Sequence, residues 1–216
     1  MKTLHYLAIA AILVLATPVV KASEQDQVVK AADIMNRFRA LPEKSIPRHV
    51  MRDAKGFAIL TVVKGAFMFS GKVGQGVVVA RTENGWSGPS FIKTGGAGFG
   101  AQIGGQVTEF VIVLNTHDAV KAFSHGGNVQ LGGALSVAAG PVGRAAGADV
   151  TPKAAIYTYS RNQGLFAGVS LEGTVIGTDK DGNDRYYGHA VTARGILNGS
   201  VNPPAKAGGL LKSLGR

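Results

Sequence analysis

The chain has 216 residues, 45% of them hydrophobic and 17% charged, which allows one packed domain or two small ones and excludes a disordered chain. It contains no cysteine, which excludes disulfides, thiolate metal sites and cysteine nucleophiles. The formal net charge is +10, but the basic residues are spread along the chain and form no block typical of nucleic-acid binding.

The first 22 residues have the layout of a secretory signal peptide. Lys2 and His5 form a short polar start, an apolar run extends from Tyr6 to Val20, and the small residue Ala22 precedes the expected cut. The apolar run is short for a membrane-spanning helix. We therefore expect cleavage after Ala22 and a mature protein that is periplasmic or secreted; an uncleaved anchor is the alternative.

Residues 24–41 are predicted to form an amphipathic helix that Ser23 caps and Pro42 ends. Pro47 is expected to open a second short helix over 47–54. The apolar stripe of the first helix can pack on a sheet or meet lipid, and its members recur at three- and four-residue steps: Val28, Ala31, Ala32, Met35 and Phe38.

From Gly56 the pattern changes to short β-branched runs, with Asn84-Gly85 as a hairpin turn and a second hairpin expected around 162–164. Two short helices are predicted, one over residues 118–123 with Asp118 as its cap and one over 192–197. Residues 179–184 are predicted to form a turn. The expected strands are 57–63, 67–69, 73–81, 86–92, 107–114, 129–138, 154–160 and 165–176.

These elements predict a mainly β (α+β) fold. We expect an antiparallel sheet or barrel-like core, with an amphipathic helix at the N-terminus and a short helix near the C-terminus. The predicted domain spans 23–198, and residues 199–216 are predicted to be a flexible basic tail. This tail could also lie on a membrane, since leucines and basic residues alternate in it.

Four glycines share one parity, so in a single extended strand they would leave one face without side chains: Gly96, Gly98, Gly100 and Gly104. Such a face allows close packing inside the protein or the approach of an acyl chain. The spacing does not fit the dinucleotide fingerprint G-x-G-x-x-G, so nucleotide binding is not expected.

Several stretches match one family in the same order along the chain. They are AILTVVKGAFMFSGKVGQGVVVAR (58–81), NGWSGPSFI (84–92), GFGAQIGGQVTEFVIVLNT (98–116), LGGALSVAAGPVGR (131–144), IYTYSRNQGLFAGVSLEG (156–173) and an Asn183…Tyr186-Tyr187-Gly188 element. With them the chain resembles the SYLF domain, from about Val28 to Leu197. The resemblance implies one compact domain that binds phospholipid. In eukaryotic members, which bind phosphoinositides and in some cases actin filaments, a basic amphipathic N-terminal segment is thought to touch the membrane.

Positions that match this N-terminal segment hold Lys30, Arg37 and Arg39. Further cations interrupt apolar or glycine-rich stretches and could line a headgroup site, although a solvated sheet face would also explain them. The predicted lipid-binding residues are Lys30, Arg37, Arg39, Lys44, Arg48, Arg52, Lys55, Lys64 and Lys72.

The predicted partner is therefore a phospholipid membrane surface, with which the protein associates peripherally in a bacterial envelope. The alternative is an envelope scaffold that binds a protein partner along an open sheet edge. No nucleic-acid partner is expected. Actin is not expected either, since the chain has a leader and lacks the SH3 module of the eukaryotic members.

Catalysis is not expected, because the histidines after the leader are scattered without metal or triad spacing. Asp179, Asp181 and Asn183 match the first positions of a calcium loop, but Asp184 and Ala190 stand where such a loop needs glycine and glutamate. We therefore predict a binding protein that has no catalytic residues, no metal and no cofactor.

Overall fold

The computed structural model describes residues 22–40, 46–67, 69–99, 104–131, 135–140, 154–162 and 175–215. The predicted leader up to residue 21 and the candidate Lys44 lie outside the described residues. None of the helices within the described ranges is long and apolar enough to span a membrane.

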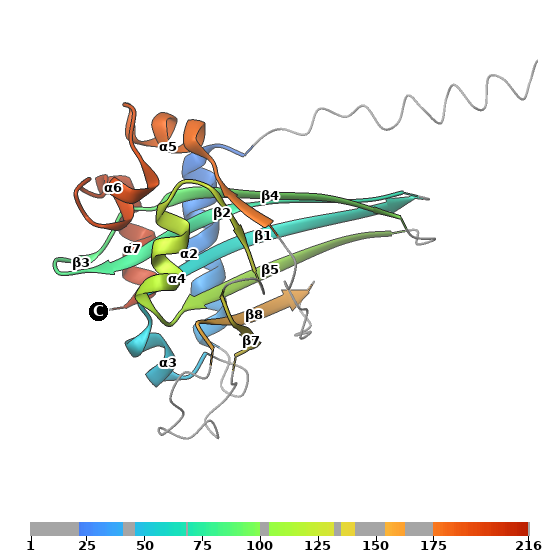
Figure 1. Ribbon diagram of the computed structural model, residues 1–216, viewed down its shortest axis with the longest axis horizontal. Helices are drawn as coiled ribbons and strands as arrows, with labels where there is room; N and C mark the ends of the chain where they lie inside the picture. The colour runs from blue at the N-terminus through green and yellow to red at the C-terminus, as the bar shows by residue number, and fades with distance from the viewer. Residues whose placement is uncertain are drawn as a thin grey trace, which may run out of the picture.

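A curled sheet forms the centre of the fold (Figure 1). Nine described strands follow the order β6-β9-β4-β2-β1-β5-β8-β7, with β3 paired to β2. All pairs are antiparallel except β7 with β8. The strands are β1 (Gly56–Phe67), β2 (Phe69–Thr82), β3 (Gly85–Trp86), β4 (Ser90–Phe99), β5 (Gly104–Leu114), β6 (Asn128–Gln130), β7 (Val137–Ala139), β8 (Ile156–Asn162) and β9 (Val175–Thr178).

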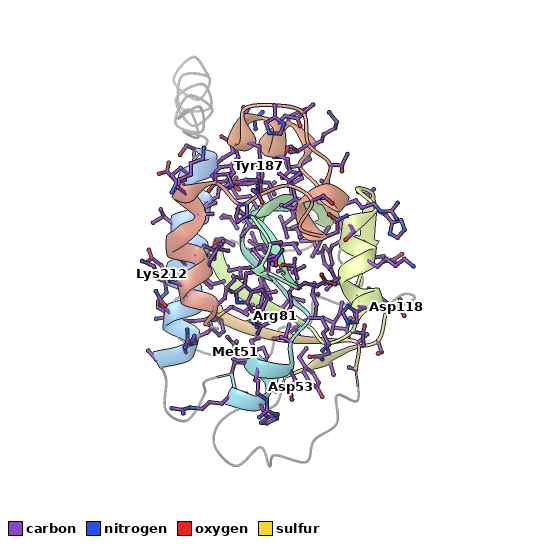
Figure 2. The ribbon with its side chains drawn as sticks, turned by 90° about the vertical axis from the view of Figure 1, so that its left-hand side faces the viewer. Met51, Asp53, Arg81, Asp118, Tyr187 and Lys212 are labelled. Carbon is purple, nitrogen blue, oxygen red and sulfur yellow. The ribbon has the colours of Figure 1, made fainter. Side chains whose placement is uncertain are left out.

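Helices cover both faces of the sheet, which confirms the predicted α+β fold. Figure 2 shows α2 and α7 on one side and α4 on the other. Side chains alternate along each strand, so β1 sends Phe57 and Ile59 toward α2, and Ala58 and Leu60 toward α4. We call these the α2 face and the α4 face. The helices are α2 (Glu24–Ala40), α3 (Arg48–Asp53), α4 (His117–Ser124), α5 (Lys180–Tyr187), α6 (Ala193–Leu197), the 3₁₀ turn η1 (Ala205–Ala207) and α7 (Gly208–Leu214).

The apolar stripe of α2 is buried against the sheet, with Met35 and Phe38 fully inaccessible. Ser23 caps the helix as predicted: its Oγ accepts from the Asp26 amide, and the Asp26 carboxylate accepts from the Ser23 amide, each at 3.1 Å. At α4 the cap differs from the expectation. Thr116 accepts from the Ala119 amide, and Asp118 lies inside the helix.

One predicted turn is wrong. Residues 179–184 do not form an exposed turn, because Asp179 caps α5 by accepting from the Gly182 amide. The hairpin predicted around 162–164 lies mostly outside the described residues, which omit 163–174. Of the described strands in this part of the chain, β8 pairs with β5 and β7, while β9 pairs with β4 and β6. They therefore lie in opposite halves of the sheet.

The glycines predicted to share one strand face are divided between two strands. Gly96 and Gly98 belong to β4, Gly104 begins β5, and Gly100 lies outside the described residues. The single bare strand face is therefore wrong. Gly96 instead leaves space for a neighbour, since a Cβ there would lie 2.8 Å from Cε of Lys72.

The C-terminal residues differ from the predicted flexible tail. Residues 205–214 form η1 and α7, and α7 packs beside α2. Leu210 and Leu214 are buried in the same core cluster as Met35 and Phe38. The leucines repeat at a helical spacing of four residues, so they form the buried side of a short helix.

Candidate functional site

One end of the sheet projects beyond the helices. The helices gather at one end, and β1, β2, β4 and β5 run past them in the other direction (Figure 1). β1 and β2 stay paired to the end of their hairpin, where Phe67 is opposite Phe69 and Phe69 is opposite Phe99 of β4. We call this part of the molecule the open end.

A row of exposed valines crosses the α2 face at the open end. Val63 of β1 pairs with Val73 of β2 and with Val107 of β5. Val73 pairs with Gly95, and the pairing of Thr94 with Ile176 places Val175 level with Gly95. Among the residues whose burial the structure describes, the exposed large hydrophobic side chains are these four valines and Val29 on α2. We call Val63, Val73, Val107 and Val175 the valine row.

Exposure in the row is substantial, from 39% at Val175 to 66% at Val73. α2 crosses the strands nearer the other end of the sheet (Figure 1), so it leaves these four valines uncovered. Contiguous exposed apolar side chains typically mark an interaction surface.

Two lysines lie at the same level on the opposite face. Lys64 directly follows Val63 and Lys72 directly precedes Val73, so strand alternation places both on the α4 face. They are cross-strand partners. Lys64 is exposed and Lys72 half-buried, with the Lys72 stem crossing Gly96. We call Lys64 and Lys72 the lysine pair.

Beyond this level, the described parts of β1, β2, β4 and β5 contain no charged residue. Residues 65–71 and 94–108 contain no Asp, Glu, Lys, Arg or His. The phenylalanines at positions 67, 69 and 99 belong to these segments. The described tip of the open end is therefore uncharged, and the lysine pair lies next to it on the side of the helices.

A groove of about 330 Å³ separates the N-terminal half of α2 from the β1–β2 hairpin. Ala31 and Ile34 line it from the helix, and Ile59 lines it from the sheet. Val63 and Val73 of the valine row also line the groove, so it opens into that row. Its volume lies near the lower limit of small-molecule sites. Asp26, Lys30 and Gln75 are its exposed polar members.

Among the predicted lipid-binding residues, Arg37 and Arg39 have partners inside the protein. Arg37 donates to both carboxylate oxygens of Glu109 on β5, at 2.6 and 3.3 Å. Arg39 donates to the Ser213 carbonyl oxygen at 2.5 Å and so ties α2 to α7. Lys30, in contrast, is exposed and makes no ion pair within the described residues.

The remaining predicted cations are not gathered with the lysine pair. Arg48 and Arg52 lie on α3, and Lys55 precedes β1, so all three are near the strand end away from Lys64. Eight strand residues separate Gly56 from Lys64, a span of about 26 Å. Arg52 pairs with Asp53 at 2.8 Å, and this hydrogen bond lowers the pKa of the Asp53 carboxyl.

The Asn183…Gly188 element has a packing role. Asn183 is fully buried: its Oδ1 accepts from the Phe91 amide at 2.7 Å, and its Nδ2 donates to the Ser90 hydroxyl at 3.3 Å. The ring of Tyr186 packs at a tilt against that of Phe91, and burial raises the pKa of the Tyr186 phenol to about 12. Tyr187 donates to the Pro89 carbonyl. The element fixes α5 to β4.

The valine row was not among the candidate residues drawn from the sequence. The available signal was the alternation in Val63-Lys64 and Lys72-Val73, which places valine and lysine on opposite faces. That signal does not reveal exposure, because a covering helix would bury the same valines. Within the described residues, no three His, Asp or Glu side chains gather in a way that could hold a metal ion.

Comparison with known proteins gives the family. Residues 95–216 match the Ysc84 family model, described as Las17-binding protein actin regulator. The chain is 48% identical over 177 residues to the SH3 domain-containing protein PJ696.02 of Schizosaccharomyces pombe, covering 80% of this chain and 41% of that protein. It is 47% identical over 177 residues to LAS seventeen-binding protein 3 of Saccharomyces cerevisiae, covering 80% and 39%.

A human relative, SH3 domain-containing YSC84-like protein 1, is 43% identical over 198 residues, which cover 88% of this chain and 58% of that protein. The chain thus spans about half the length of the curated relatives it matches. The residues matched by the family model include β5, α5 and the C-terminal helices. From this match and the motifs in its sequence, the chain belongs to the Ysc84 family of SYLF-domain proteins.

Proposed function

We propose that this domain binds reversibly to the surface of anionic phospholipid membranes through the open end of its sheet. The supporting observation is the position of the valine row and the lysine pair at one level on opposite faces of the same strands. Peripheral membrane binding needs apolar area together with cations near the lipid phosphates.

An end-on orientation uses all these features together. The lysine pair would lie among the phosphates, with the strand ends pointing inward. Three residues separate Lys64 from Phe67, which corresponds to about 10 Å of strand and matches the depth at which interfacial segments bury apolar groups. The described residues that would pass the phosphates, 65–67, 69–71, 94–99 and 104–108, carry no charge.

The expected affinity is modest. Four half-exposed valines would contribute about 2–3 kcal/mol in total. Lys30 and the lysine pair would add about 1 kcal/mol each near an anionic surface. The sum of about 5 kcal/mol resembles the marginal, reversible binding given by one myristoyl chain. Arg37 and Arg39 would contribute less than the sequence indicates, because their guanidinium groups already bind Glu109 and the Ser213 carbonyl.

Co-sedimentation with vesicles tests the proposal. We expect binding to phosphatidylglycerol-containing vesicles and weaker binding to phosphatidylcholine vesicles, with a decrease at high salt. Replacing the lysine pair (Lys64→Gln with Lys72→Gln) should reduce binding to anionic vesicles about thirtyfold, since each lysine contributes about 1 kcal/mol. The matched control, Lys121→Gln with Lys212→Gln, removes the same charge from exposed positions on α4 and α7 and should leave binding unchanged.

A second pair of variants tests the valine row. Val63→Asn with Val73→Asn should weaken binding to both kinds of vesicle, since it removes apolar area without changing charge. Equal losses in the lysine variant and its control would show that net charge alone attracts the protein, and would refute the assigned surface. No retention by either vesicle would refute membrane binding.

The location that we propose for this activity is a bacterial envelope, outside the cytoplasm and after removal of the leader. A protein partner is the second candidate. It is supported by the family description and by the name of LAS seventeen-binding protein 3, which states that this relative binds LAS seventeen. Failure of vesicle binding combined with capture of one defined envelope protein would favour this candidate.

A further inference from the structure

We propose that the groove between α2 and the β1–β2 hairpin binds one single-chain anionic amphiphile, with its acyl chain inside and its headgroup at Lys30. The inference rests on the proposed membrane function and assigns a ligand class to one part of the same surface. The occupant would be a fatty acid, an alkyl phosphate or one chain of an anionic phospholipid.

The walls of the groove fit a hydrocarbon chain. Ile34 and Ala31 form the helix side, while Ile59 and Val63 form the sheet side. Ile34, Ala31 and Ile59 are almost fully shielded from solvent, whereas Val63 is 44% exposed. The groove is therefore closed and apolar at its inner end and opens along the valine row. A chain lying in it would extend toward the same lipid phase that the open end meets.

The charge at the mouth selects an anionic headgroup. Lys30 lines the groove, is exposed, and makes no ion pair within the described part of the chain. Asp26 lies one helical turn earlier, but its carboxylate is held at the start of α2, where it accepts from the Ser23 amide. The lysine ammonium therefore remains available to a phosphate or carboxylate.

The neutral polar residues at the groove leave the apolar chain path intact. Gln75 lies on β2 opposite Thr61 of β1, and both line the groove. Gln75 is exposed, while Thr61 is buried. Neither carries a charge, so Lys30 and Asp26 are the only ionic groups that line the described groove.

Titration of the full chain with dodecyl phosphate below its micelle concentration tests the inference. We expect saturable binding of one molecule per chain, weaker binding of dodecanol and none of inorganic phosphate. Lys30→Glu should weaken dodecyl phosphate binding by at least about tenfold, and Lys30→Arg should preserve it. Lys121→Glu, the same charge reversal on exposed α4, is the control and should have no effect.

The position of the ligand can be read separately, because the chain has no cysteine and one introduced thiol can be labelled cleanly. A polarity-sensitive fluorophore at Gln75→Cys should shift to the blue when dodecyl phosphate binds. The same label at Asp118→Cys, on the opposite side of the sheet (Figure 2), should not respond. Equal responses at both positions would overturn the inference.

The remaining outcomes distinguish the groove from the membrane surface. Vesicle binding that depends on the lysine pair, without saturable dodecyl phosphate binding, would overturn the groove and keep the proposed function. Dodecyl phosphate binding that depends on Lys30, without vesicle binding, would support the groove and refute the proposed membrane binding. Binding that appears only after removal of residues 1–22 would assign the groove to the chain's own leader and overturn the inference.

Discussion

The guanidinium of Arg37 on α2 lies 2.6 Å from Oε1 of Glu109 on β5, in a two-pronged contact that joins the helix to the sheet. Arg161 of β8 lies 3.8 Å from the other carboxylate oxygen of Glu109. An arginine that the sequence presents as a lipid contact is therefore part of the packing of α2. Replacing Arg37 should therefore lower the stability of the fold more than it weakens lipid binding.

Arg37→Gln should lower the free energy of unfolding by about 1 kcal/mol, because it removes a partly buried ion pair and leaves Glu109 with the more distant Arg161. Urea unfolding monitored by circular dichroism measures the change. Lys30→Gln, on the same helix but exposed, should stay within about 0.5 kcal/mol of the unmodified chain. Equal stabilities of the two variants would contradict a structural role for Arg37.

Asn183→Ala should destabilise the fold by about 1–3 kcal/mol, since it leaves the buried Phe91 amide without its acceptor. Chemical unfolding again gives the value. Asn202→Ala, at an exposed loop position, is the matched control and should be near neutral. A small effect at Asn183 would mean that water replaces the lost amide.

Gly188→Ala should cost about 1–2 kcal/mol, because Gly188 has a φ of +79° and ends α5 in the left-handed conformation. A Cβ at Gly188 would meet no atom within 4 Å, so the cost is conformational and not steric. Gly208→Ala is the internal control: Gly208 is also unobstructed but has a φ of −54°. There alanine should be neutral or slightly stabilising.

The contacts of the Asp184 carboxylate lead us to expect that the fold loses stability in acid. Its carboxylate accepts from the Val191 amide at 2.9 Å and from Lys180 at 3.0 Å, and these contacts lower the pKa of the carboxyl from 3.8. A lowered pKa in the folded state means that the stabilisation is complete above 3.8 and disappears as the pH falls through the lower value.

The comparison of Asp184→Asn with the unmodified chain isolates this contribution. The variant should have the lower unfolding midpoint at pH 6, and the difference between the two proteins should shrink as the pH falls below 3.8. Thermal or urea unfolding across this range provides the measurement. A difference that stays constant over the whole range would mean that ionisation of Asp184 does not stabilise the fold.

Local sequence patterns predicted the elements well where one physical signal dominated. The apolar repeat of α2 and the proline after it defined that helix to within one residue of its observed end at Ala40. Asn84-Gly85 correctly predicted a tight turn, and Gly85 has the positive φ of +112° that such a turn requires. In both cases the determinants lie within a few residues of each other.

Long-range contacts explain the failures. Residues 179–184 are rich in turn-forming side chains, yet they become the cap and first turns of α5 because Asn183 is buried against β4, about ninety positions away in the sequence. The partner strands of β9 were likewise not indicated by its neighbours in the chain. The exposure of the valine row depends on where α2 crosses the strands, which alternation along β1 does not encode.

The pairing of α2 with α7 also constrains when the protein can fold. α2 is the first described helix and α7 the last, and each supplies side chains to one core cluster, with Arg39 hydrogen-bonded to the Ser213 carbonyl. A ribosome delivers residue 39 long before residue 213. During synthesis the apolar side of α2 therefore lacks this partner until residues 208–214 have emerged, and the core that the two helices share cannot be completed before then.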